Sequence, residues 1–101
     1  METYVILMEM TQKGMDEIHK IPATVDELEE KFAKKNVKLK GFYKVMGETD
    51  YVAIVESKDD IDGLAAVAAF GKTGYFDTLT LKAYTMDEMK KAVGIYAENF
   101  K

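Results

Sequence analysis

The five residues YVAIV at 51–55 are hydrophobic at every position, and no other segment constrains the fold as much. A strand that is apolar on both faces lies in a sheet that is covered on both sides, whereas an alternating strand has one open face. The segment YVILMEM at 4–10 is hydrophobic at all but one position. We therefore expect these two segments to be the central strands of one sheet.

Two further strands are predicted beside this pair. In VKLKGFYKVM at 37–46, apolar residues alternate with lysine, which is typical of an edge strand. The alternation places four side chains on one face of that strand, namely Val37, Leu39, Tyr43 and Val45. Residues 76–84 form the fourth strand.

Three helical segments separate or follow these strands. Pro22 is expected to interrupt the first, which restarts at Thr24 with capping-box spacing to Glu27 and stops at Asn36. Cap spacing of Ser57 with Asp60 starts the second, whose apolar face is predicted to contain Ile61, Leu64, Ala65 and Ala68. The pair Thr85 and Glu88 has the spacing of a capping box and starts a C-terminal helix.

The resulting order, βαββαβ followed by a helix, predicts an α+β, ferredoxin-like fold with an antiparallel four-stranded sheet. In that topology the first and third strands are central, in agreement with their hydrophobicity. Right-handed crossovers place both connecting helices on the same face of the sheet. Residues 1–101 are therefore expected to form a single domain whose second sheet face is uncovered unless the last helix reaches it.

An uncovered sheet face has a large energetic cost in a domain of this size. Four exposed side chains of the central strands would forfeit about 1.5–3 kcal/mol each, against a total stability of about 5–15 kcal/mol. We therefore predict that the same face of a second copy covers it, which gives a twofold homodimer with a barrel between the subunits.

The composition excludes several classes of function. The chain has no arginine, so no bidentate side chain is available for guanine or phosphate, and we expect no nucleic-acid partner. It also has no cysteine, which excludes a thiol nucleophile and a disulfide framework. The N-terminal apolar run is too short for a signal peptide or a membrane span, so we expect a cytoplasmic protein without a membrane partner.

Three segments resemble the GYD domain family of the dimeric α/β-barrel superfamily in their order and spacing. They are YVILMEMTQKG at 4–14, FYKVMGETDYVAIVES at 42–57 and AFGKTGYFDTLTLKAYTMDE at 69–88. The family pattern at the hairpin, Gly-x-Tyr-Asp, reads Gly47-Glu48-Thr49-Asp50 here, with Thr49 in place of the tyrosine. The resemblance implies a barrel dimer. Related barrels include cofactor-independent monooxygenases, isomerases and the amino-acid-binding domain of feast/famine transcription regulators.

Nine residues are candidates for chemistry or ligand binding. His19 is the only histidine, the residue type that most often serves as a general base. The other two candidate proton-transfer groups are Tyr43 and Asp50. Side chains in or near the ends of strands are predicted to line an apolar cavity between subunits: Tyr4, Phe42, Tyr51, Thr78, Thr80 and Tyr84. The alternative for each tyrosine is ordinary packing with the hydroxyl at solvent or on a partner.

We expect neither a metal nor a cofactor. The acidic run SKDDIDG at 57–63 resembles a calcium loop, but Lys58 and Ala69 stand where such a loop needs acidic ligands. Carboxylates at a helix N-terminus explain the run better. In the hairpin turn, Asp50 is expected to bond the amides of the turn itself.

Two hypotheses about function follow. The first is a homo-oligomeric binding or structural module that holds at most a small apolar ligand between subunits. The second is a cofactor-independent monooxygenase or isomerase that uses His19, Tyr43 or Asp50. An enzyme needs a titratable group in an enclosed pocket, whereas a module needs only an apolar contact surface.

Overall fold

The two hydrophobic segments are the central strands of a four-stranded sheet, as predicted. In the computed structural model, which describes residues 1–101, β1 (Glu2–Met10) pairs with β3 (Tyr51–Ser57) on one side and with β4 (Phe76–Ala83) on the other. The other edge strand is β2 (Val37–Lys44), and the order is β2-β3-β1-β4 with every pair antiparallel. The α+β, ferredoxin-like fold is therefore confirmed.

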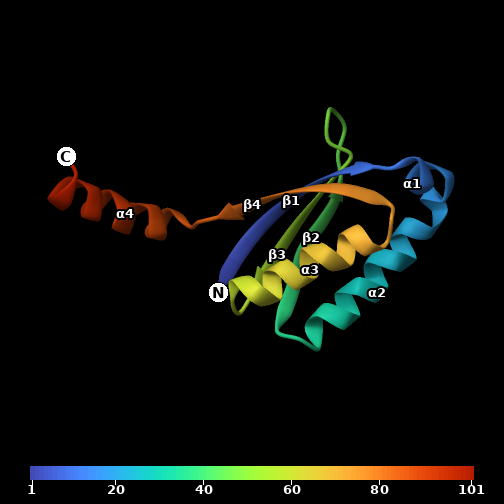
Figure 1. Ribbon diagram of the computed structural model, residues 1–101, viewed down its shortest axis with the longest axis horizontal. Helices are drawn as coiled ribbons and strands as arrows, with labels where there is room; N and C mark the ends of the chain where they lie inside the picture. The colour runs from blue at the N-terminus through green and yellow to red at the C-terminus, as the bar shows by residue number, and fades with distance from the viewer.

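Both crossover connections place a helix on the same face of the sheet (Figure 1). The first connection consists of α1 (Gln12–Asp16), the 3-10 turn η1 (Ile18–Lys20) and α2 (Ile21–Ala33). The second is α3 (Asp60–Lys72). The last helix, α4 (Met86–Asn99), follows β4 and extends away from the sheet and from the other helices (Figure 1). None of these helices has the length and hydrophobicity needed to cross a bilayer.

The predicted starts of α2 and α3 are wrong. Helix α2 begins at Ile21 rather than Thr24, because Pro22 occupies the first turn, where the amide that proline lacks has no partner in the helix. Helix α3 is capped by Asp59, whose carboxylate accepts the amide of Asp62 at 2.9 Å. Ser57 ends β3 instead, and its hydroxyl donates to the carbonyl of Asp59 at 2.6 Å.

The other two helix boundaries are confirmed. Asn36 has a left-handed backbone, with φ of 60°, just beyond α2. At the start of α4, the Thr85 hydroxyl accepts the Glu88 amide at 3.1 Å, and the Glu88 carboxylate accepts the Thr85 amide at 2.8 Å. This reciprocal pair is a complete capping box.

A β-bulge in β2 changes which residues face the helices. The register of β2 against β3 shifts between Leu39 and Gly41. Beyond the shift Phe42 packs on the core, whereas Tyr43 points to the opposite face and is exposed. The expectation that Tyr43 shares a face with Val37 and Leu39 is therefore wrong, because a bulge inserts a residue and resets the alternation.

The core lies between the sheet and the helices α2 and α3. Alternate residues of the central strands point into it, and an aromatic cluster fills the end near the start of β4. Phe70 of α3 is fully buried and contacts Phe32 of α2, with ring centroids 5.5 Å apart. It also contacts Phe42 and Phe76, with centroids 6.1 and 6.5 Å apart.

Helix α3 packs on the sheet through small residues rather than through its predicted apolar face. Its buried residues are Gly63, Ala66 and Phe70. A Cβ atom at Gly63 would lie 2.4 Å from a ring carbon of Tyr4, so only glycine allows the helix to approach this closely. The bulky and small apolar residues predicted to be buried all point to solvent instead: Ile61, Leu64, Ala65 and Ala68.

Candidate functional site

The sheet face opposite the helices carries a block of hydrophobic side chains that no element covers. We call it the open face, and it consists of Val5, Leu7, Tyr43, Val52, Ile54, Leu79 and Leu81. The strand register aligns these residues in rows. Leu7 pairs with Val52 on one side and Leu79 on the other, while Val5 pairs with Ile54 and Leu81.

The open face has the layout of a protein interface, with an apolar centre and a charged rim. Leu79 is 60% exposed and Leu81 is 47% exposed. At one end of the face Lys40 lies 3.8 Å from the carboxylate of Glu56, and at the other Glu9 pairs with Asp77 across β1 and β4. Helix α4 does not reach this face (Figure 1). The open face of the sheet is thus suited to contact with an apolar surface.

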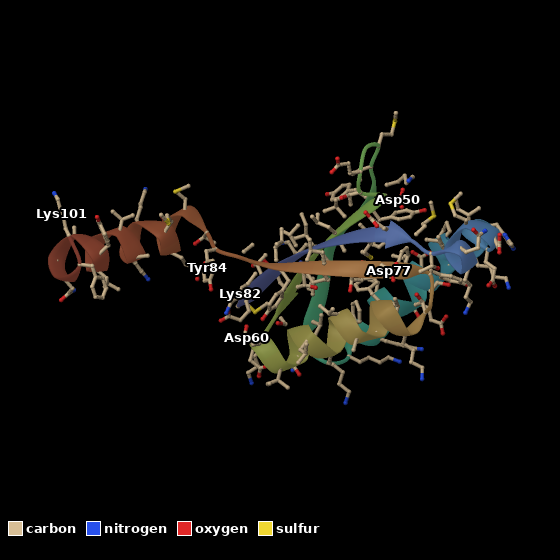
Figure 2. All side chains as sticks on the ribbon, turned by 45° about the horizontal axis from the view of Figure 1, so that its top comes forward. Asp50, Asp60, Asp77, Lys82, Tyr84 and Lys101 are labelled. Carbon is tan, nitrogen blue, oxygen red and sulfur yellow. The ribbon has the colours of Figure 1, made fainter.

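A polar cluster joins the start of α3 to the ends of β1 and β4. The Tyr4 hydroxyl donates to the carboxylate of Asp60, which also lies 3.1 Å from the ammonium of Lys82. Lys82 forms a second ion pair, with Glu2 at 2.9 Å. Figure 2 shows Lys82 at the end of β4 close to Asp60 at the start of α3.

The electrostatics of this cluster suit a structural clamp rather than a proton-transfer site. Burial and the hydrogen bond to Asp60 raise the pKa of Tyr4 to about 12, so its phenol stays protonated at neutral pH. The Tyr4 hydrogen bond and then Lys82 lower the pKa of Asp60. Hydrogen bonds to Glu2 and Asp60 raise the pKa of Lys82. All three groups therefore keep their ordinary neutral-pH states, which favours the bonds among them.

A hollow of about 360 Å³ lies beside this clamp, between α3 and β4. We call it the α3–β4 hollow, and its lining includes Tyr4, Ile61, Gly63, Leu64, Val67 and Thr80. The hydroxyl of Thr80 is buried and has no hydrogen-bond partner. Asp60 and Lys82 also line the hollow, so it fits an apolar group with a polar end.

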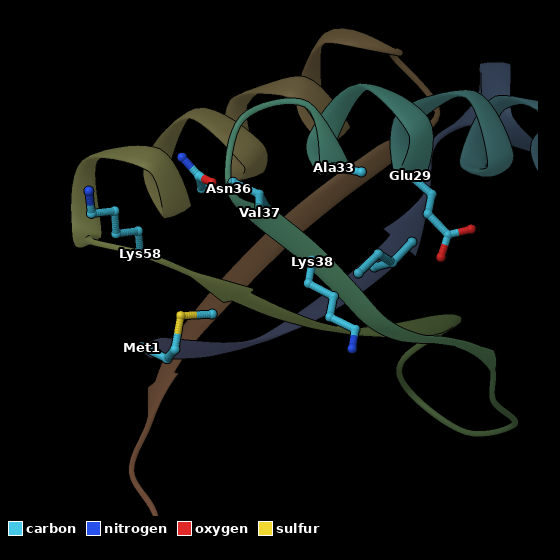
Figure 3. Close-up of a pocket in the computed structure, with 8 residues that line it drawn as sticks. Met1, Glu29, Ala33, Asn36, Val37, Lys38 and Lys58 are labelled. Carbon is cyan, nitrogen blue, oxygen red and sulfur yellow. The ribbon is translucent and has the colours of Figure 1, made fainter.

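Two larger hollows flank α2 along the free edge of β2. One, of about 570 Å³, lies between the end of α2 and the start of β2 (Figure 3). Figure 3 shows Glu29 and Ala33 on the helix, Val37 and Lys38 on the strand, and Met1 beside them. The other, of about 550 Å³, lies further along β2. Both combine aliphatic walls with charged rims.

The six predicted ligand residues do not share one hollow within the chain. Tyr4 and Thr80 line the α3–β4 hollow, while Phe42 and Tyr51 line the second hollow along β2, with their ring centroids 5.3 Å apart. Burial and the charge of Asp50 raise the pKa of Tyr51. Thr78 lines a hollow of about 240 Å³, and Tyr84 is exposed between β4 and α4. A shared cavity between subunits stays a prediction.

The three candidate proton-transfer groups line none of these hollows. His19 is exposed in η1. Tyr43 is exposed on the open face, with its ring against Gly41. No three histidine or acidic side chains gather in a way that could hold a metal ion. The three candidate proton-transfer groups therefore lie outside the hollows, and the most extensive exposed feature is the apolar open face.

Asp50 links the β2–β3 hairpin to the central strand. Its carboxylate accepts the amide of Met10 at 2.8 Å, and its own amide donates to the carbonyl of Met8 at 3.0 Å. The expectation that Asp50 bonds the amides of its own turn is therefore wrong, because β1 runs beside the hairpin and presents an unpaired amide. Gly47 in this turn has a positive φ of 135°, a conformation that favours glycine.

Two features of the candidate site were not predicted. Leu79 and Leu81 alternate with Thr78 and Thr80, and this period-2 pattern indicates that the two leucines share one face of β4. The ion pair of Asp60 with Lys82 joins residues 22 positions apart and has no sequence signature.

The sequence matches the family model described as "GYD domain" over residues 4–93. A curated relative, the glutamine synthetase and cystathionine beta-lyase binding protein of Thermus thermophilus, is 26% identical over 90 residues. The match covers 88% of this chain and 95% of that protein.

Solved structures have the same fold. MtbAldR gives a TM-score of 0.61 at 12% identity over 83% of this chain, which spans only 52% of its length. FFRP-DM1 gives 0.56 at 24% identity, covering 83% of this chain and all of that one. TTHA0845 from Thermus thermophilus gives 0.50 at 25% identity, covering 84% and 95%. The first two likenesses concern the fold alone.

Proposed function

The chain belongs to the GYD domain family, and from this starting point we propose that it is a homo-oligomeric binding module whose subunits pair through their open faces. The observation that carries this proposal is the uncovered apolar block on the central strands and β4. Complete burial of a leucine or valine is worth about 1.5–3 kcal/mol, and a half-exposed one gains roughly half of that on contact. Tyr43, Leu79 and Leu81 are about half exposed and the other four side chains are less exposed, so the seven together still contribute a substantial term for a chain of this size.

A twofold pairing also suits the charges around the open face. Lysines flank it on the β2 side, at positions 38 and 40, whereas Glu9 and Asp77 lie at the far end of β1 and at the start of β4. Twofold symmetry can bring the basic edge of one subunit to the acidic corner of the other. Such a pair forms a barrel with room for at most a small apolar ligand.

We further propose that the assembled module binds other proteins. The Thermus relative is named as a binding protein for glutamine synthetase and cystathionine beta-lyase. In this chain the residues weighed for catalysis have other roles or surroundings. Asp50 is bonded to β1, and His19 and Tyr43 lie outside the hollows. These positions do not favour the alternative of a monooxygenase or isomerase, which needs a titratable group beside its ligand.

The pairing is tested by light scattering on the full chain at micromolar concentration. The wild-type protein is expected to have a mass of at least two chains, and the double variant Leu79→Lys/Leu81→Lys is expected to fall to half the wild-type mass. Met46→Lys is the matched control, because Met46 is 99% exposed at the hairpin, away from the open face. A monomeric wild type, or a double variant of unchanged mass, would refute the pairing.

Binding to other proteins is tested with glutamine synthetase and cystathionine beta-lyase from the organism that encodes the chain. Calorimetric titration of each enzyme with the wild-type module is expected to give saturable binding to at least one of them. If neither enzyme binds at tens of micromolar, this part of the proposal fails while the pairing stands.

A further inference from the structure

Helix α3 is apolar on two opposite sides. One side packs on the sheet through Gly63, Ala66 and Phe70. The other side forms what we call the α3 outer stripe, which consists of Ile61, Leu64, Ala65 and Ala68. Ile61 is 74% exposed and Leu64 is 66% exposed. A helix that is hydrophobic all round is normally buried all round, so the outer stripe lacks a partner.

Helix α4 also has an apolar face without a partner. It has no buried residue, and five large apolar side chains from Met86 to the C-cap share one face while Ile95 lies on the other side; this face, the α4 stripe, is made of Met86, Met89, Val93, Tyr96 and Phe100. An isolated helix of 14 residues is only marginally stable in water, even with a good cap. Its stability must therefore come from a surface that the stripe contacts.

We propose that α4 of one subunit docks antiparallel along the α3 outer stripe of a second copy of the chain. The lengths match, since α3 has 13 residues and α4 has 14, or about 20 Å each at 1.5 Å per residue. The docked helix covers a stripe that the sheet-to-sheet pairing leaves exposed.

The residue spacing of the two stripes fits an antiparallel register. With Val93 level with the gap between Leu64 and Ala65, Met89 falls beside Ala68 and Tyr96 beside Ile61. Val93 and Met89 of α4 thus meet the small Ala65 and Ala68 of α3, and Tyr96 meets Ile61. This is the interlocking of ridges and grooves that close helix packing requires.

The charges at the helix ends favour the same orientation. The first turn of α3 carries Asp60 and Asp62, and its last turn carries Lys72. The first turn of α4 carries Asp87 and Glu88. Antiparallel docking brings this acidic turn to Lys72 and opposes the two helix dipoles, both of which are favourable.

The same charges disfavour docking of α4 on α3 of its own chain. Strand β4 ends beside the start of α3, where Lys82 lies 3.1 Å from Asp60. Only Tyr84 and Thr85 separate β4 from α4, so a helix folded back from there runs parallel to α3. Its acidic first turn would then face the acidic first turn of α3. A second copy has no such restriction.

The outer stripe and the open face lie on opposite sides of the chain, because α3 separates the stripe from the sheet (Figure 1). Docking by α4 is therefore independent of the pairing proposed above. When both contacts form, α4 joins one sheet-paired dimer to another, and the assembly is larger than a dimer.

Single-cysteine variants test the docking directly, because the chain has no cysteine of its own. Ala65→Cys and Val93→Cys are purified separately, unfolded, mixed and refolded together before mild oxidation. A disulfide between these two positions joins different copies by design. It forms only if the two Cα atoms approach to within about 7 Å. Lys91→Cys is the matched control, since Lys91 is an exposed α4 residue on the side away from the stripe.

The expected result is a disulfide-linked pair containing Ala65→Cys and Val93→Cys, at least fivefold more abundant than the pair formed with Lys91→Cys. Peptide mass spectrometry identifies the linked residues. The proposal is overturned if the Val93→Cys and Lys91→Cys yields are equal, or if Val93→Cys links only to itself. It is also overturned if a double variant, Ala65→Cys/Val93→Cys, forms its disulfide within one chain. Sheet pairing can fail in light scattering while this cross-link still forms, so the two proposals are distinguishable.

Discussion

The contact of Gly14 with the start of β4 gives the sharpest prediction about stability. A Cβ atom at Gly14 would lie 2.4 Å from the carbonyl oxygen of Tyr75. That oxygen also accepts the amide of Thr11 at 2.9 Å, while the Thr11 hydroxyl donates to the carbonyl of Gly74 at 2.6 Å. The obstacle is backbone held by two hydrogen bonds, so it cannot swing aside as a side chain can.

The cost of Gly14→Ala follows from these contacts. Forcing a methyl group into packed backbone costs about 1–3 kcal/mol, and weakening the bond between Thr11 and Tyr75 adds about 0.5–1.5 kcal/mol. We expect the free energy of unfolding to fall by about 1.5–4.5 kcal/mol in total. For a domain of this size the melting temperature then drops by about 10–25 °C.

Urea unfolding followed by circular dichroism measures this change at one fixed protein concentration, since association alters apparent stability. Gly71→Ala is the matched control, because Gly71 lies in α3 and a methyl group added there would have no atom within 4 Å. The control should be neutral or stabilised by up to about 1 kcal/mol through helix propensity. If Gly14→Ala costs less than about 0.5 kcal/mol, the contact is not the constraint described.

Three further predictions concern polar contacts. Asp50→Ala removes the acceptor of the last β1 amide and should lower the free energy of unfolding by about 1.5–3 kcal/mol in urea titrations, and an unchanged midpoint contradicts this. Tyr4→Phe removes the hydrogen bond that is the largest cause of the lowered pKa of Asp60. That pKa should then rise toward its ordinary value in a carbon-detected NMR titration, and the absence of a rise would contradict the hydrogen bond between Tyr4 and Asp60. The hydrogen bond from the Thr85 amide lowers the pKa of Glu88 in the folded state. Ionised Glu88 therefore stabilises α4 fully above pH 4.5, and this stabilisation is lost as the pH falls through the lower folded-state pKa. NMR chemical shifts of α4 that do not change in this pH range would contradict the prediction.

Hydrophobic patterning sufficed to predict the sheet, because local alternation and topology pointed to the same central strands. The two uniformly apolar segments are β1 and β3, and the lysine-rich segment is the edge strand β2. The capping box of Thr85 was equally readable, since it depends only on residues three apart. These features are local or follow from the order of elements.

The prediction failed where a contact distant in sequence decided the local structure. The inward face of α3 is set by the Tyr4 ring, which leaves room for Gly63 and not for Ile61. The partner of Asp50 is the amide of Met10, 40 residues away. The bulge in β2 reverses Tyr43 without any proline or asparagine to mark it. No window of neighbouring residues contains this information.

The position of β1 in the chain also affects how the protein folds during synthesis. This strand emerges first, but both strands that pair with it come much later, β3 from residue 51 and β4 from residue 76. The hydrophobic strand β1 therefore has no backbone hydrogen-bond partners while most of the chain is synthesised. Unpaired strands of this kind are prone to aggregate, and sheets built from distant segments form slowly. We expect the nascent chain to depend on holding chaperones, or on the early docking of α2, until β4 closes the sheet.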